Sequence, residues 1–155
     1  MIIVEAGVAD CGALARTSKR AFDADTSVGA PGPGGPPGYD SAEWHRAALG
    51  WGQVFRIIDA GEDVGGAIVF LQSPTQARLA RIWLVPEAQN KGVGREAMTA
   101  LESRFSAVAR WTLDTPTWNT RNHHFYAQCG YRVIGREGDD GLLFEKLIET
   151  HARTD

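Results

Sequence analysis

Short apolar runs alternate along the chain with segments in which apolar residues recur every three to four positions. This alternation is typical of a mixed α/β domain, because runs rich in β-branched residues form strands and the longer period forms helices. Asp10 and Ser41 are suited to cap two helices, and Gly130 is suited to end another. The predicted strands are 2–5, 54–59, 64–71, 79–85, 111–115, 131–136 and 142–147, and the predicted helices lie within 10–28, 41–49, 93–108 and 120–128.

The composition of one segment excludes a helix or a strand. Residues 29–38 read Gly-Ala-Pro-Gly-Pro-Gly-Gly-Pro-Pro-Gly. Proline removes backbone donors, and glycine has a high entropy cost in a helix or strand. Two interpretations are open: an exposed connector between two helices, or a wall over a binding site.

Length and composition narrow the class of protein. The chain has 155 residues, of which 43% are hydrophobic and 23% charged, as expected for one globular domain. We assign this domain to 1–148 and a C-terminal tail to 149–155. The net charge of −3 argues against a broad nucleic-acid surface, and no run is long enough to span a membrane.

The termini and cysteines favour a cytoplasmic protein. The first residues lack the basic and apolar regions of a secretory signal. Cys11 and Cys129 are far apart in sequence and not at metal-ligand spacing, so we expect reduced thiols and no metal site.

The segment with the clearest chemistry joins the predicted strand 79–85 to the helix that follows it. A helix begins with unpaired N–H groups and the positive end of its dipole. Gly92 and Gly94 leave room for an anion near these amides, and Lys91 and Arg95 add positive charge. The segment therefore predicts a cradle for a phosphate or diphosphate. A solvated helix start is the alternative for the two basic residues.

Two familiar phosphate loops fit this segment poorly. The Walker order of glycine, lysine and serine or threonine is absent. Gly92, Gly94 and Ala97 match a dinucleotide fingerprint nominally. That fold, however, requires a parallel βαβ unit near the N-terminus, whereas a predicted hairpin precedes this loop.

The segment resembles the acetyl-CoA loop of the GNAT superfamily of N-acetyltransferases, Gln/Arg-x-x-Gly-x-Gly/Ala. The residues 89–94, Gln-Asn-Lys-Gly-Val-Gly, fit every fixed position. A later GNAT signature resembles Asn119, Phe125-Tyr126 and Gly130-Tyr131 in type and spacing, although Asn122 stands where the family often has alanine. The resemblance covers 79–135 well and implies a central mixed, mostly antiparallel twisted sheet flanked by helices on both faces.

The resemblance implies acetyl-CoA as co-substrate. Its pantetheine arm would pair with backbone groups of Leu84 and Val85. Asn119 would bind the same arm, with a plain helix cap as the alternative, and Arg121 would meet another phosphate or remain on the surface. The diphosphate would bind at the loop residues Gln89, Asn90, Lys91, Gly92, Val93, Gly94 and Arg95.

Tyr126 corresponds to the family residue that protonates the departing thiolate, although a purely structural aromatic is the alternative. The base that deprotonates the amine is less evident, because 78–81 reads Arg-Leu-Ala-Arg where some relatives have a glutamate. Asp114 and His45 are the favoured candidates, and a water relay without a dedicated base is equally compatible. The other candidates are Asp40, Glu43, Glu87, His123 and His124.

The acceptor would be an amine of a small molecule or peptide, with no nucleic acid or membrane as partner, and a homodimer is left open. Its pocket would be built from 22–51 and the strand ends, where Tyr39, Trp44 and Trp51 either form aromatic walls or pack the helices on the sheet. Two other classes are open: a non-catalytic acyl-CoA-binding or regulatory domain, and a nucleotide-binding protein.

Overall fold

Seven strands are hydrogen-bonded into one sheet in the order β1-β2-β3-β4-β5-β7-β6. The computed structural model describes residues 1–149, so the last six residues of the predicted tail lie outside the described part. The strands are β1 (Ile2–Glu5), β2 (Gln53–Asp59), β3 (Glu62–Ser73), β4 (Gln76–Leu84), β5 (Arg110–Pro116), β6 (Arg132–Glu137) and β7 (Gly141–Leu147). The helices are α1 (Cys11–Asp23), α2 (Ala42–Ala48), α3 (Val93–Arg104) and α4 (Thr120–Gln128), with 3₁₀ turns η1 (Val8–Asp10), η2 (Ala24–Val28) and η3 (Pro86–Ala88).

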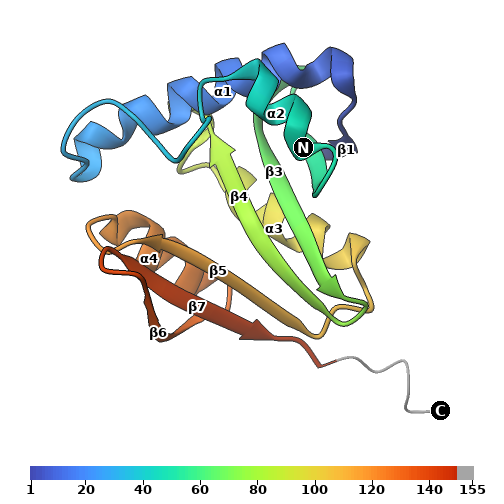
Figure 1. The fold of residues 1–155 in the computed structure, drawn as a ribbon, viewed down its shortest axis with the longest axis vertical. Coiled ribbons are helices and arrows are strands. Elements are labelled where there is room, and N and C mark those ends of the chain that lie inside the picture. The colour runs from blue at the N-terminus through green and yellow to red at the C-terminus, as the bar shows by residue number, and fades with distance from the viewer. Residues whose placement is uncertain (150–155) are drawn as a thin grey trace.

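One pair of strands differs from all the others. β4 and β5 are parallel, and they pair only where Gln76–Arg78 lie beside Arg110–Thr112. The remaining pairs are antiparallel. Beyond Arg78 the two strands diverge, which separates the sheet into two arms (Figure 1).

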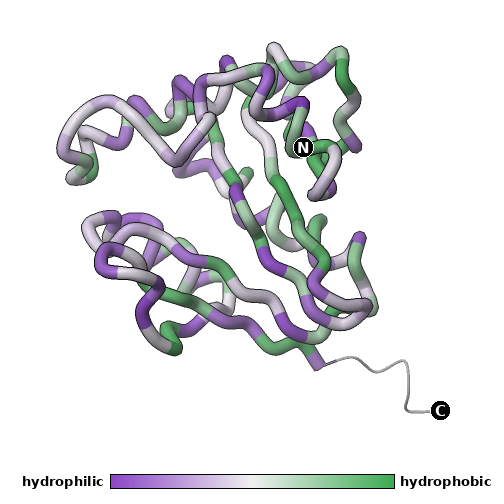
Figure 2. Tube along the Cα trace, in the orientation of Figure 1, coloured by the Kyte–Doolittle hydropathy of each residue, from purple (hydrophilic) through white to green (hydrophobic). Residues whose placement is uncertain are grey.

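Alternation along the strands supplies an apolar surface to each face of the sheet. On β2, Val54 joins a cluster with Leu14 of α1 and Ala48 of α2. Phe55 points to the opposite face and joins the cluster that includes Met98 of α3. The helices therefore cover both faces, as predicted, and the middle of β3 between them is markedly hydrophobic (Figure 2).

Local signals placed most helix starts correctly. The Ser41 hydroxyl caps α2 by accepting a hydrogen bond from the Trp44 N–H at 3.0 Å. Asp10 does precede α1, but its carboxylate accepts from the Gly7 N–H instead of capping the helix. α3 ends at Arg104, earlier than predicted, and Val108 reaches the core from the segment that follows.

Within the described residues, no helix is both long and apolar enough to cross a membrane.

Substitution of Phe55 tests whether this core is assigned correctly. Its ring is fully buried and contacts Phe105 at a centroid distance of 5.9 Å. Because truncation leaves a cavity, Phe55→Ala should lower the free energy of unfolding by about 3–5 kcal/mol in urea titrations. Phe70→Ala on β3 is the control, since that side chain is 40% exposed, and should cost less than about 1 kcal/mol. Equal losses for the two variants would contradict the assigned core.

Candidate functional site

Two cavities meet in the gap between β4 and β5. The first, of about 230 Å³, lies among β4, the start of α3, α4 and the end of α1. The second, of about 640 Å³, lies among β4, the C-terminal half of β5 and the Pro/Gly segment. Residues of α1, η2, β4 and α4 line both cavities, so the two spaces adjoin. The shared residues are Phe22, Asp25, Ile82, Asn122 and Tyr126.

The start of α3 forms a concave backbone turn on the first cavity. Asn90 has φ 61° and Gly92 has φ 83°, a left-handed conformation that favours glycine. Gly94 also lines the cavity, and a Cβ there would lie 3.0 Å from the Phe125 ring. The first amides of an α-helix lack partners within the helix, and Gly92, Gly94 and Arg95 at the start of α3 line this cavity. The geometry suits an anion.

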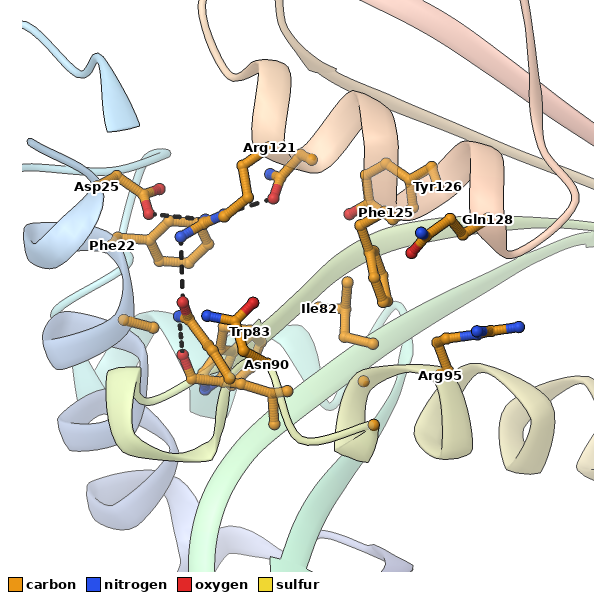
Figure 3. A pocket seen from close by; sticks show the side chains of 16 residues that line it. Phe22, Asp25, Ile82, Trp83, Asn90, Arg95, Arg121, Phe125, Tyr126 and Gln128 are labelled. Carbon is orange, nitrogen blue, oxygen red and sulfur yellow. Dashed lines mark hydrogen bonds and ion pairs between the residues drawn. The ribbon is translucent and has the colours of Figure 1, made fainter. Parts of the chain in front are cut away.

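The basic and apolar side chains of this loop lie in different surroundings in the structure. Arg95 extends from α3 and lines the first cavity (Figure 3). Lys91 is exposed and is not among the lining residues. Val93, the first residue of α3, is buried and packs in a cluster with Ile57 and Ala97. Only its backbone is therefore available to a ligand.

The backbone groups of Val85, predicted to pair with the pantetheine arm, already have partners within the protein. The Val85 N–H donates to the Val64 carbonyl at 2.8 Å, and the Val85 carbonyl accepts from the Ala88 N–H at 3.0 Å. Val85 therefore has no unpaired backbone group for an added strand. Because the groups of an antiparallel strand alternate in direction, those of Leu84 face the diverging side, and Leu84 lines the first cavity.

Gln89 and Arg121 connect this edge to the other arm. The Gln89 amide donates to the Leu84 carbonyl at 2.9 Å, and its oxygen accepts from Arg121 at 3.1 Å. Arg121 also forms an ion pair with Asp25 at 3.0 Å (Figure 3). Burial raises the pKa of Asp25, while Arg121 opposes that shift. The charge of Arg121, predicted to meet a phosphate, is thus already paired with a carboxylate.

Tyr126 stands at the junction of the cavities. Its side chain is 7% exposed, and its ring packs against Tyr131 and Phe144. Burial raises the pKa of Tyr126 well above its ordinary value, so the hydroxyl is protonated at neutral pH. Asn119 caps α4 by accepting from the Asn122 N–H at 3.0 Å, and it lines the second cavity rather than the first.

The two candidate bases lie in different surroundings. Asp114 lines the second cavity and accepts from Arg78 at 2.5 Å. His45 is fully buried, packs against Trp44 and Trp83, and lines neither cavity. Its Nδ1 lies 2.7 Å from the Ser41 carbonyl oxygen. The structure therefore brings Asp114, and not His45, to the junction region.

Of the two roles left open for the aromatic residues of 22–51, Trp44 has the packing role, because it packs against the cluster that contains Leu14 and Trp83. Tyr39, Trp44 and Trp51 line neither cavity, whereas Phe22 and Trp118 line the second one. The Pro/Gly segment contributes residues 30–36 to the lining, which favours the wall interpretation over a plain connector.

Sequence reasoning missed several lining residues. Phe22 and Asp25 lie within the segment 22–51 that is expected to build the pocket, but no motif singles them out, and Trp118 lies outside that segment. Arg81 was noted only because a carboxylate was absent there. The signal that could have found it is the position itself, on the strand that leads into the phosphate-type loop.

A family model for the acetyltransferase (GNAT) family matches residues 23–131. The chain belongs to the GNAT family. The uncharacterized protein YrkN of Bacillus subtilis is 32% identical over 107 residues. That match covers 58% of this chain and 58% of YrkN, so the chain spans little more than half the length of this curated relative.

Solved structures agree on the GNAT fold. PaiA N-acetyltransferase of Thermoplasma acidophilum, in complex with coenzyme A, has a TM-score of 0.78 at 16% identity, over 96% of this chain and 100% of that one. The ribosomal-protein-S18-alanine N-acetyltransferase of Escherichia coli has 0.75 at 17%, over 99% and 97%. A GNAT acetyltransferase of Elizabethkingia anophelis with acetyl-CoA bound has 0.60 at 17%, over 74% and 93%.

Among residues 1–149, no group of histidine, cysteine and carboxylate side chains is placed to hold a metal ion.

His45 provides a pH test that separates a structural role from catalysis. Burial lowers its pKa, so the folded chain keeps the ring neutral while the unfolded chain binds a proton below its ordinary pKa. Stability is therefore complete above that value and falls as the pH drops. Between about pH 7.5 and about pH 5.5, this group should remove at most about 1.4 kcal/mol from the free energy of unfolding.

His45→Gln should lose that part of the pH dependence in urea unfolding, whereas His124→Gln, an exposed histidine on α4, should keep it. An unchanged pH dependence in His45→Gln would show that the ring is not held neutral in the core.

Proposed function

We propose that this chain transfers an acetyl group from acetyl-CoA directly to the amine of an acceptor. One observation carries the proposal: two separate cavities meet at Tyr126, and one of them lies against the start of α3. A direct transfer needs this arrangement, because the thioester and the amine must approach from different sides and react at one point.

The first cavity fits the coenzyme. The amides of 90–95 suit the diphosphate, with Arg95 in the cavity lining supplying positive charge and Lys91 as an exposed cation on the same loop. The pantetheine arm would lie along β4 beside Leu84 and extend the sheet as an added strand. The PaiA complex with coenzyme A and the Elizabethkingia structure with acetyl-CoA support the choice of ligand. Bound acetyl-CoA supplies the activated acyl group.

The residues of the chain would manage the protons. An alkylammonium must lose a proton before it attacks the thioester carbonyl, and Asp114 or water in the second cavity would accept it. A backbone N–H on the open edge of β4 would stabilise the oxyanion. Tyr126 would then donate its phenolic proton to the sulfur as the carbon–sulfur bond breaks, and the raised pKa keeps that proton in place beforehand.

A non-catalytic acyl-CoA-binding domain is the second candidate. The observation in its favour concerns Asp114, the carboxylate proposed as the base. Its side chain forms an ion pair with Arg78 at 2.5 Å. Release of free thiol from acetyl-CoA in the presence of a panel of amines distinguishes the two. Turnover supports the enzyme, and coenzyme binding without turnover with any amine supports the binding domain.

Tyr126→Phe tests the role of the hydroxyl. It keeps the ring packing but removes the proton, so kcat for the best amine of the panel should fall at least about tenfold. The dissociation constant for coenzyme A, measured by calorimetry, should stay within about threefold.

Tyr131→Phe is the matched control, because Tyr131 is a buried neighbour of Tyr126 that lines neither cavity. It should retain the wild-type kcat. Intact turnover in Tyr126→Phe would make that tyrosine structural.

A further inference from the structure

Arg81 occupies an unusual place on β4. Ile68 of β3 pairs with Arg81 and Val69 pairs with Leu79, so Ala80 is an extra residue in a β-bulge. A bulge redirects the side chains beside it. The guanidinium of Arg81 lies over the Trp44 ring at 3.8 Å, and Arg81 lines the second cavity.

The hydrogen bonding of Arg81 is incomplete. Its Nη2 donates to the Pro37 carbonyl at 2.5 Å, a neutral acceptor in the Pro/Gly segment. Its Nη1 is buried without a partner. Burial lowers the pKa of Arg81 to about 10, and no neighbouring carboxylate offsets that shift. A buried guanidinium N–H without a partner is costly, because that N–H has lost water and gained no acceptor.

The other charges around the second cavity are already paired. Asp114 binds Arg78 at 2.5 Å, and Asp25 binds Arg121 at 3.0 Å. Of the charged residues that line this cavity, Arg81 is therefore the one whose charge is not compensated within the described chain. The second cavity thus has a positive charge to offer and no spare negative one.

We propose that Arg81 binds a carboxylate of the acceptor, so that the acceptor is a small molecule with both an amine and a carboxylate group. This inference rests on the proposed acetyl transfer. A carboxylate accepts two parallel hydrogen bonds from a guanidinium. It would replace the neutral Pro37 carbonyl at Nη2, and a reorientation of the Arg81 side chain on binding would bring the buried Nη1 to the same carboxylate. A volume of about 640 Å³ is in the range of small-molecule pockets.

The position of Arg81 also suits the reaction. The next residue, Ile82, lines both cavities, so a carboxylate held at Arg81 leaves the rest of a small acceptor at their junction. Without a carboxylate on the acceptor, the positive charge of Arg81 would disfavour a second positive charge nearby. The same charge opposes polyamines, which carry several positive charges and no negative one.

Matched pairs of acceptors test the proposal. The probes are α- and ω-amino acids, the carboxamide of each, spermidine and phosphoethanolamine. With acetyl-CoA, the wild-type protein should favour the best amino acid over its carboxamide by at least about tenfold in kcat/KM. Calorimetry on the protein saturated with coenzyme A should show the same order of binding without any turnover.

Arg81→Met should reduce that preference to within about threefold, while Arg81→Lys, which keeps the charge, should retain part of it. Arg132→Met is the control on β6, where the side chain is 72% exposed, and should match the wild type. Thermal melts check that each variant folds. If Arg81→Met does not fold, the test is the ratio of kcat/KM for the amino acid to kcat/KM for its carboxamide that Arg81→Lys retains.

The results also separate the two proposals. A carboxamide or spermidine that equals the amino acid in the wild type, or a preference that survives in Arg81→Met, overturns the role of Arg81. A higher kcat/KM for phosphoethanolamine than for the best amino acid overturns the assignment of a carboxylate as the group that Arg81 binds. If no amine releases thiol, acetyl transfer fails, and the calorimetric comparison alone then decides whether Arg81 binds a carboxylate.

Discussion

The early end of pairing between β4 and β5 is the constraint on which the site depends. The two parallel strands share only three residue pairs before they separate. Past that point, the open edge of β4 presents backbone groups that no neighbouring strand satisfies. Both cavities lie in the resulting gap, and Tyr126 reaches it from α4 (Figures 1 and 3).

A gap of this kind needs contacts that hold its sides apart at a fixed width. Arg121 of α4 provides one, because it binds Asp25 of η2 and Gln89 beside β4. The large apolar clusters on each face of the sheet keep the strands themselves in place. These contacts fix the positions of the elements around the site, and the Pro/Gly segment over the second cavity is the part whose sequence excludes regular structure.

Local sequence signals predicted most of the fold. Periodicity placed the strands and helices, Ser41 capped α2 as expected, and the loop around Gly92 and Gly94 indicated the family that the family model then confirmed. These features depend on neighbouring residues, which is why the sequence alone reveals them.

Features that depend on long-range packing were not predictable in the same way. The pairing of Val85 with Val64 follows from strand register, and the burial of His45 follows from how α2 packs on Trp83. The direction of Arg81 depends on a bulge at Ala80, which no residue pattern announces. Residues far apart in the chain decide each of these cases.

A crystal structure of the protein with bound coenzyme A is the most direct test of the central claim. The account predicts the diphosphate within hydrogen-bond distance of the amides of 90–95, and the pantetheine arm along Leu84 with the thiol near Tyr126. A coenzyme bound elsewhere, or a gap between β4 and β5 that the protein's own side chains fill, would contradict it.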